Sequence, residues 1–298
     1  MFSIEVSNVS KIYDNGHQAL KDINLKVRKG QFLALLGKNG AGKTTLVKIL
    51  TSLVKKSSGK ILINGKDLDQ NTQSIKISIG MMPQELNMSI FEKAIDILIT
   101  QAGYFGIDSN IALLRATKLL KDLNLWDKRN QPLMSLSGGM KKRLMIARSL
   151  MHNPDIIFFD EPTTAVDVQI RKKIWEIMQQ LNNQGKTIIL TTHHFEEVEK
   201  LCDSVAIISK GKIIIHDPLT KILEQYTKQK FLIQIAPNNI YFIDNTINKI
   251  SNTLLEVEVN IGKTLSQYIE LILSKSIKIH SVQPKNNMIE ELFLNLEE

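Results

Sequence analysis

Nine consecutive residues have the types and the spacing that bind a triphosphate. They follow the pattern G-x-x-x-x-G-K-T, and we call them the glycine loop. The glycine loop consists of Gly37, Lys38, Asn39, Gly40, Ala41, Gly42, Lys43, Thr44 and Thr45. Glycines let the backbone curl so that successive N–H groups face one anion, and a helix N-terminus adds partial positive charge. Lys43 could reach the β- and γ-phosphates, and the Thr44 hydroxyl could ligate Mg²⁺. The loop alone predicts a nucleoside triphosphate site.

Apolar runs flank the glycine loop and predict the elements that must position it. Residues 32–36 form a continuous apolar run of strand length, and residues 46–50 read as the first turns of a packed helix. A glycine-rich turn before an ordinary helix is the alternative interpretation. Because the phosphate-binding motif needs a strand, a loop and a helix in this order, the flanks favour phosphate binding.

A pair of carboxylates follows a second apolar run. Residues 156–159 are Ile-Ile-Phe-Phe, and Asp160 and Glu161 come directly after them. Such a run is typical of a parallel strand that is buried on both faces. Asp160 would emerge beside the glycine loop and hold Mg²⁺ through a water, while Glu161 could polarise the attacking water as general base. Two solvated acids at a strand end are common alone, so it is the pairing with the glycine loop that favours catalysis.

A second candidate anion site lies between the glycine loop and the two acids. Ser137 is suited to cap a helix. Gly138 and Gly139 would leave the backbone N–H groups accessible at the start of that helix. Serine and two glycines before a helix are usually no more than a cap. Their place between two phosphate motifs is what makes them a candidate site.

The composition is that of a globular chain with a real core. Of the 298 residues, 43% are hydrophobic, and the formal net charge is +8. The lysines are scattered without interleaved aromatic residues, so we expect a solvated basic surface and no nucleic-acid partner. The single cysteine, Cys202, excludes an internal disulfide. No signal peptide is apparent, and no run approaches the roughly 18 apolar residues of a spanning helix.

The hydrophobic periodicity predicts an α/β chain around the glycine loop. Residues 1–9 and 19–27 alternate as strands, and Asn64-Gly65 is a hairpin signal, so we expect an antiparallel sheet. Residues 75–82 also read as a strand. Residues 90–129 have a helical pattern.

The pattern changes past about residue 228, where a small α+β appendage is expected. Its last helix should cover residues 288–296, where apolar side chains share one face. We therefore expect a nucleotide-binding domain at 1–228, with a helical subdomain at about 88–150, and an accessory domain at 229–298.

The segment Leu136-Ser137-Gly138-Gly139-Met140 resembles the signature sequence of ATP-binding cassette (ABC) ATPases. The resemblance covers residues 1 to about 228. It implies a P-loop NTPase (RecA-like) core, an antiparallel β subdomain and a helical signature subdomain, with ATP and Mg²⁺ as cofactors. It also implies that two copies bind head to tail, each glycine loop facing Ser137, Gly138, Gly139 and Asp167 of the other copy.

The remaining family marks fall in order along the chain. Gln84 resembles the Q-loop glutamine, whose amide oxygen joins the Mg²⁺ shell. Tyr13 stands where the family keeps an aromatic ring to stack on adenine, and residues 165–167 resemble the D-loop. His193 resembles the switch histidine that contacts the γ-phosphate. The resemblance thus implies an ATPase whose catalytic residues are Lys43, Gln84, Glu161 and His193 and whose magnesium residues are Thr44, Gln84 and Asp160.

Two details depart from the common family pattern. His194 follows His193, and the spacing from the preceding apolar run favours His193 as the acting imidazole. Thr164-Ala165 replaces the common Ala-Gly, which removes a glycine near the expected seam between the two copies. Every catalytic position of the family pattern is retained.

Within the family, residues 85–106 and the ending at residues 288–294 resemble ATPases of bacterial ABC-2-type exporters. This resemblance implies integral-membrane permease partners and a cytoplasmic chain held peripherally at the inner face of the membrane. The alternative is a soluble ABC ATPase acting on DNA, ribosomes or iron–sulfur assembly. DNA-acting members carry coiled coils or zinc modules, and ribosome-acting members carry a second cassette. The iron–sulfur assembly ATPase lacks this kind of C-terminal appendage. Importer ATPases fit less well because their C-terminal extension is usually longer.

Overall fold

The structure is a computed structural model that describes residues 1–226, 229–237, 246–259 and 264–285. The chain divides into two compact units, Met1–Asp217 and Pro218–Glu298. The domain boundary expected at residue 228 stays a prediction. The helix expected over residues 288–296 lies outside the described residues. No described helix is both long and apolar enough to cross a membrane.

The first unit begins with an antiparallel sheet of order β2-β1-β4-β5. The asparagine–glycine pair at residues 64–65 joins the last two strands, as its turn signal predicts. One face of the sheet carries the alternating apolar residues and packs into the main core. The strands are β1 (Phe2–Ile12), β2 (Gln18–Arg28), β4 (Ser58–Ile63) and β5 (Lys66–Asp67).

A second sheet of six strands has the order β10-β9-β3-β8-β7-β6. β3 pairs in parallel with β8 and β9, and β7 pairs in parallel with β6 and β8. Because these strands run in parallel, the carboxyl ends of β3, β7 and β8 meet at one edge, where ligands bind in open α/β sheets. The strands are β3 (Phe32–Leu36), β6 (Ile79–Met82), β7 (Ile156–Asp160), β8 (Thr187–Thr191), β9 (Ser204–Ser209) and β10 (Lys212–Pro218).

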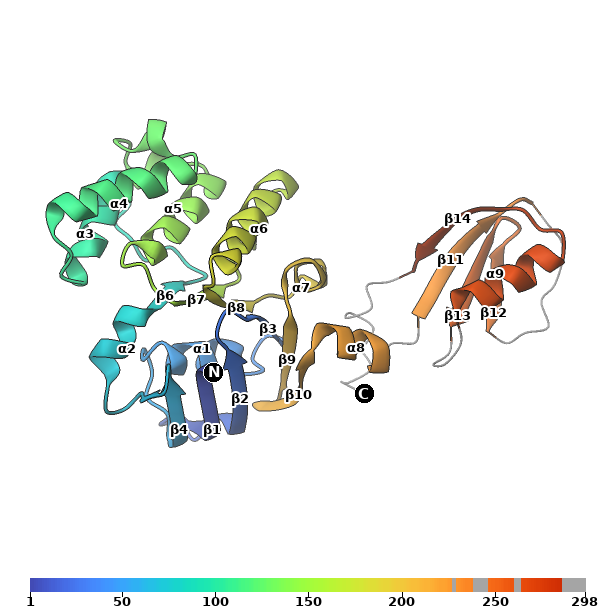
Figure 1. Cartoon of the computed structure of the whole chain (residues 1–298), viewed down its shortest axis with the longest axis horizontal. Helices are drawn as coiled ribbons and strands as arrows, with labels where there is room; N and C mark the ends of the chain where they lie inside the picture. Colours follow the sequence, from blue (N-terminus) through green and yellow to red (C-terminus); the bar gives the residue numbers. More distant parts are fainter. Residues whose placement is uncertain (227–228, 238–245, 260–263, 286–298) are drawn as a thin grey trace. The chain divides into compact units, whose positions relative to one another are not determined.

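Three helices, α3 (Ala94–Tyr104), α4 (Ser109–Asp122) and α5 (Gly138–Leu150), pack on one another and form the expected helical subdomain, apart from the antiparallel sheet (Figure 1). The short helices η1 (Trp126–Lys128) and η2 (Leu133–Ser135) lead from α4 into α5. The other helices of this unit are α1 (Lys43–Leu50), α2 (Thr72–Ser78), α6 (Val168–Asn183) and α7 (Phe195–Leu201).

The prediction of one strand over residues 75–82 is wrong in its first half, which belongs to α2. Isoleucines at 75, 77 and 79 imitate the two-residue period of a strand. In the structure Ile75 is buried and Ile77 is 58% exposed, because residues two apart on α2 point to different sides of the helix. The buried Ile79 is the first residue of β6.

The second unit contains α8 (Leu219–Tyr226) and a four-stranded antiparallel sheet of order β12-β13-β11-β14. α9 (Leu265–Ser274) begins at a capping box formed by Thr264 and Gln267. Apolar side chains of α9 and the sheet form a separate small core. The strands are β11 (Gln229–Ile235), β12 (Ile247–Ser251), β13 (Leu254–Val259) and β14 (Ile279–Pro284).

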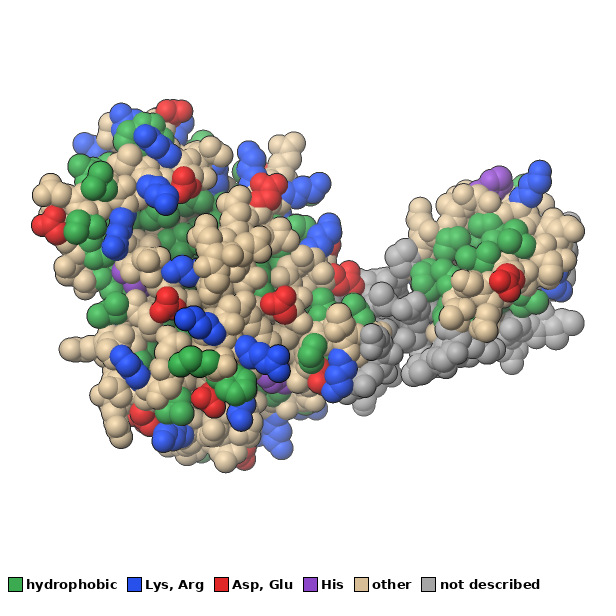
Figure 2. Space-filling view, in the orientation of Figure 1, with side chains coloured by type: hydrophobic (Ala, Val, Ile, Leu, Met, Phe, Trp, Pro, Cys, Tyr) green, Lys and Arg blue, Asp and Glu red, His purple; other side chains and the backbone are tan. Residues whose placement is uncertain are grey.

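On the face of the first unit that Figure 2 shows, lysine and arginine side chains are dispersed among acidic ones. They do not gather there into a single stripe. This dispersion is the surface expected of a solvated basic chain.

Candidate functional site

The glycine loop joins β3 to α1 in a conformation that two of its glycines make possible. A Cβ at Gly37 would lie 2.5 Å from the carbonyl oxygen of Ile208. A Cβ at Gly42 would lie 2.8 Å from the carbonyl oxygen of Ala19, and its φ of 112° is rarely adopted by other residues. The loop therefore lies tightly against the sheet, with its N–H groups at the start of α1 where an anion is favoured.

Lys43 is the first residue of α1, and its side chain is almost fully buried. Its ammonium donates hydrogen bonds to the carbonyl oxygens of Gly37 at 2.5 Å and Lys38 at 3.1 Å. Burial lowers the pKa of Lys43, while the nearby carboxylates of Glu161 and Asp160 raise it. Two backbone carbonyl groups thus hold the charge inside the loop.

Tyr13 lies beside the same loop. Its hydroxyl is 3.4 Å from the Thr45 hydroxyl, and the Lys11 ammonium lies 5.0 Å from the ring centroid. A hollow of about 350 Å³ adjoins the loop and is lined by Gly16, His17, Gln18, Ala19, Lys21, Gly40, Lys210 and Gly211. An aromatic ring and an open hollow therefore stand next to the phosphate-binding backbone.

Asp160 ends β7 at the edge where the glycine loop lies, and only 5% of it is exposed. Its Oδ1 accepts a hydrogen bond of 2.5 Å from the Thr191 hydroxyl of β8. Burial raises the pKa of Asp160, whereas the Thr191 hydrogen bond and the charge of Lys43 lower it. Thr191 was not singled out from the sequence, because its partner is 31 residues away along the chain.

Three segments converge on the carboxylate of Glu161. Its Oε2 accepts hydrogen bonds from Gln84 Nε2 at 3.1 Å and from the Thr164 hydroxyl at 3.0 Å. The same oxygen is 3.6 Å from His193 Nδ1. The neighbouring His194 ring stacks at a tilt on His193, and burial lowers the pKa of His194. His193 is therefore the imidazole that faces Glu161, and together these groups can orient a water and a phosphate.

The residues predicted to face a second copy gather around the starts of α5 and α6. The Ser137 hydroxyl caps α5 by accepting a hydrogen bond from Met140 N, and Asp167 caps α6 by accepting one from Ile170 N. A Cβ at Gly139 would lie 2.9 Å from the Ile170 side chain, so the two helix starts are neighbours. Ser137, Gly138 and Asp167 are exposed. The predicted anion-binding residues thus stand at two helix starts, one at α1 and one at α5.

A family model described as "ABC transporter" matches residues 20–164. The Nod factor export ATP-binding protein I of Cupriavidus metallidurans is 38% identical over 211 residues, which are 71% of this chain and 69% of that protein. The linearmycin resistance ATP-binding protein LnrL of Bacillus subtilis is 31% identical over 310 residues, covering 98% of this chain and 97% of its own. This chain belongs to the ABC transporter ATP-binding proteins.

Solved structures of ABC proteins share the fold. The structure of cbiO1 from Clostridium perfringens has a TM-score of 0.69 at 28% identity and covers 75% of this chain and 91% of its own. A dimeric post-hydrolysis structure of the cassette MJ0796, bound to ADP and phosphate, has a TM-score of 0.67 at 28% identity. The match covers 72% of this chain and 98% of that chain. The fold class predicted from the sequence is confirmed. As an ABC ATPase, the chain binds ATP and couples ATP hydrolysis to transport.

Lys142 of this ABC ATPase is a residue that sequence reasoning missed. It lies on α5, after the signature residues, and its ammonium donates a 3.2 Å hydrogen bond to the carbonyl oxygen of Gln84. Burial lowers its pKa, and the carboxylates of Glu161 and Asp160 raise it. The signature helix is therefore joined to the Gln84 segment within one chain. The only signal in the sequence was a run of basic residues after the signature.

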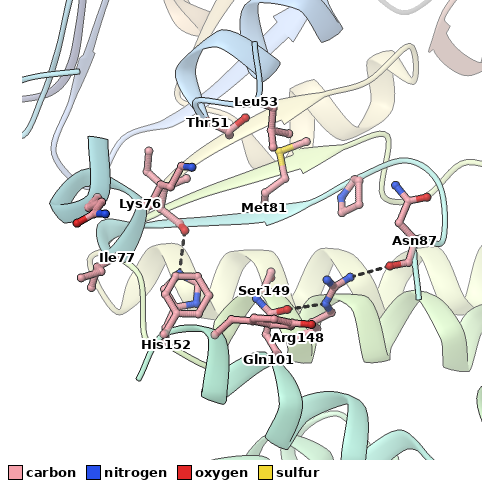
Figure 3. A pocket seen from close by; sticks show the side chains of 15 residues that line it. Thr51, Leu53, Lys76, Ile77, Met81, Asn87, Gln101, Arg148, Ser149 and His152 are labelled. Carbon is pink, nitrogen blue, oxygen red and sulfur yellow. Dashed lines mark hydrogen bonds between the residues drawn. The ribbon is translucent and has the colours of Figure 1, made fainter. Parts of the chain in front are cut away.

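A groove of about 670 Å³ lies between the parallel sheet and the helical subdomain of this ATPase. Figure 3 shows Arg148 in it, with Nε donating to Gln101 Oε1 at 2.8 Å and a terminal nitrogen donating to Asn87 O. His152 Nε2 bonds Ile79 O at 2.8 Å. Among the groove residues with large exposed apolar area are Leu53, Ile77 and Tyr104.

Proposed function

We propose that this chain is the ATPase subunit of an ABC-2-type exporter, held at the inner face of the membrane by separate permease subunits. The observation that carries the proposal is the match to the linearmycin resistance protein, which spans 98% of the chain and so includes the C-terminal unit. The relatives named for Nod factor export support the direction of transport.

Within this proposal, the glycine loop and Lys43 bind the phosphates of ATP, and Tyr13 stacks on the base. Glu161 takes a proton from the attacking water, because its carboxylate lies where Gln84 and His193 converge. His193 and Lys43 stabilise the negative charge of the γ-phosphoryl group. The chemistry needs no covalent step on the protein.

The residues fit Mg²⁺ as the metal. The proposed ligands are the Thr44 hydroxyl, the Gln84 amide oxygen and the Asp160 carboxylate, and hard oxygen donors suit this ion. Mg²⁺ usually keeps several waters and takes the phosphates as further ligands, so a few protein oxygens suffice. When bound, Mg²⁺ would neutralise charge on the phosphates.

We further propose that a second copy of the chain completes the site, with its Ser137 and Gly138 facing the γ-phosphate. A Cβ at Gly138 would meet no atom within 4 Å, so nothing within this chain requires a glycine there. A phosphate approaching the helix start from a second chain would require it, because a side chain would block the backbone N–H groups. The exposed Ser137 is available for the same contact.

The groove between sheet and helical subdomain is the proposed contact for a cytoplasmic segment of the permease. Arg148 and Lys76 line it beside apolar side chains, which suits an amphipathic helix that carries an acid. Tyr104 is 79% exposed at this groove, whereas Leu114 of α4 is 71% exposed and does not line it. These two residues give a test variant and a matched control.

Co-purification tests this function. The full chain should be co-expressed with its membrane permease and isolated through an affinity tag on the permease. We expect Tyr104→Asp to lose the permease while keeping the ATPase activity of the isolated chain, and Leu114→Asp to keep both. If the permease retained both variants equally, the groove would not be its contact. A chain that never co-purifies with an integral-membrane protein would contradict the exporter function.

A further inference from the structure

Glu197 of α7 is a fully buried acid that none of the proposed roles uses. Its Oε1 accepts hydrogen bonds from the Thr163 hydroxyl and from Trp175 Nε1 at 2.9 Å. Its Oε2 accepts a 2.6 Å hydrogen bond from the Thr192 hydroxyl. An ionised carboxylate is costly to bury unless donors replace its water, and three donors do so here.

Two of these donors belong to the segments that carry the proposed catalytic groups. Thr163 comes two residues after Glu161, and Thr192 directly precedes His193. The Thr192 hydroxyl also accepts a 3.0 Å hydrogen bond from the backbone N–H of His194. The backbone on both sides of His193 is therefore tied to Glu197. The third donor, Trp175, lies on α6 and leads to neither catalytic group.

We propose that Glu197 is a positioning residue for hydrolysis: one buried carboxylate clamps the Glu161 segment and the His193 segment together and so sets the approach of His193 to the Glu161 carboxylate. The proposal rests on the proposed function, because it takes its purpose from the roles given there to Glu161 and His193.

The geometry of Glu161 shows why such a clamp is needed. Its φ of 48° is a conformation that non-glycine residues rarely adopt, so the surrounding contacts must maintain it. The 3.6 Å separation between His193 Nδ1 and Glu161 Oε2 depends on two segments that are about 30 residues apart along the chain. Each segment reaches Glu197 through one threonine hydroxyl. A displacement of about 1 Å at a catalytic group can cost about 100-fold in rate.

The first test is Glu197→Gln in the purified full-length chain with Mg–ATP. A glutamine keeps the size of the side chain but has one accepting oxygen, whereas Glu197 accepts hydrogen bonds through both of its oxygens. We expect kcat to fall by about 10- to 100-fold, with the KM and the Kd for ATP unchanged. Glu196→Gln is the matched control, because Glu196 is exposed, pairs with Lys200 and is one residue away. That control should retain the wild-type kcat.

The second test separates positioning from mere stability. Thr163→Val and Thr192→Val remove the donors that lead to the catalytic segments, and Trp175→Phe removes the donor that leads to α6. All three should lower Tm, but only the threonine variants should lower kcat at temperatures well below Tm. The double variant Thr163→Val/Thr192→Val should lose less than the product of the single losses, because both act through one carboxylate. If Glu197→Gln does not fold, the threonine and tryptophan variants test the proposal without it.

Three results would overturn the inference: a wild-type kcat in a folded Glu197→Gln variant, a wild-type kcat in both threonine variants, or an equal loss of kcat in Trp175→Phe. Glu161→Gln serves as the reference variant. If Glu161→Gln hydrolyses ATP as fast as the wild type, the proposed function fails instead. If Glu161→Gln is slow while the threonine variants are normal, only the role of Glu197 fails.

Discussion

Glu161 combines a strained backbone with a carboxylate that several groups share. Its N–H donates to the carbonyl oxygen and to the hydroxyl of Thr191, and these two bonds help to fix the turn after β7. Gln84 and Thr164 donate to its side chain. An oriented acid beside a phosphate-binding loop is what activation of a water requires.

Replacing Glu161 with glutamine tests its role as general base. The variant keeps the size of the side chain but cannot take a proton. We expect ATP binding and Tm to match the wild type, whereas turnover should fall by about 10²- to 10⁴-fold. Steady-state phosphate release and equilibrium binding of ATP measure the two effects. Wild-type turnover in this variant would remove Glu161 from the catalytic step.

Packing between secondary-structure elements places a titratable group under the groove. His152 follows α5, stacks on Phe105 with 3.8 Å between ring centroids, and bonds Ile79 O of β6. Burial lowers the pKa of His152, the bond to Ile79 raises it, and the charges of Arg115 and Lys186 lower it further. The neutral imidazole therefore joins the helical subdomain to the parallel sheet.

The lowered pKa of His152 predicts a pH dependence of stability. The unfolded chain binds this proton near the ordinary pKa of about 6.5, whereas the folded chain binds it only at lower pH. The contribution of His152 to the free energy of unfolding is therefore complete above about pH 6.5. It is lost as the pH falls from there towards the pKa that His152 has in the folded chain.

Thermal unfolding of the wild type and of His152→Gln from about pH 7.5 to about pH 5.5 measures this contribution. The stability advantage of the wild type should shrink across that range. His17→Gln, at an exposed histidine, should track the wild type throughout. A stability difference between the wild type and His152→Gln that does not change with pH would contradict the lowered pKa of His152.

The elements that carry the site could be predicted because their patterns are local. β3 and β7 read as unbroken apolar runs since both faces of a parallel sheet are covered. α2 was missed because three alternating isoleucines imitate a strand, and β12 was missed because its polar Asn248 and Lys249 give no apolar period.

The contacts of Lys142 and Glu197 could not be predicted in the same way. Glu197 stands beside Glu196 in a charged helix and reads as a solvated acid, yet two of its three donors lie 22 and 34 residues away in the sequence. Lys142 reaches the carbonyl oxygen of Gln84 across 58 residues. Such contacts depend on how distant segments pack, which a periodic pattern does not encode.

At the scale of the whole molecule, the central claim is that one chain holds half of each ATP site. The glycine loop of one copy would be closed by the exposed signature residues of another. Ser137→Arg places a long cation at the signature while leaving the glycine loop intact. Lys43→Ala damages the glycine loop, so it should weaken ATP binding, while leaving the signature intact. Each variant alone should be inactive in hydrolysis.

The most direct measurement is therefore the ATPase activity of an equal mixture of Ser137→Arg and Lys43→Ala chains. A mixed dimer contains one site with both halves intact, so the mixture should recover about a quarter of the wild-type rate if copies pair at random. Each variant must first be shown to be folded by its thermal unfolding. A mixture as inactive as its folded components would contradict the shared site, because it would mean that the glycine loop and the signature must come from the same chain.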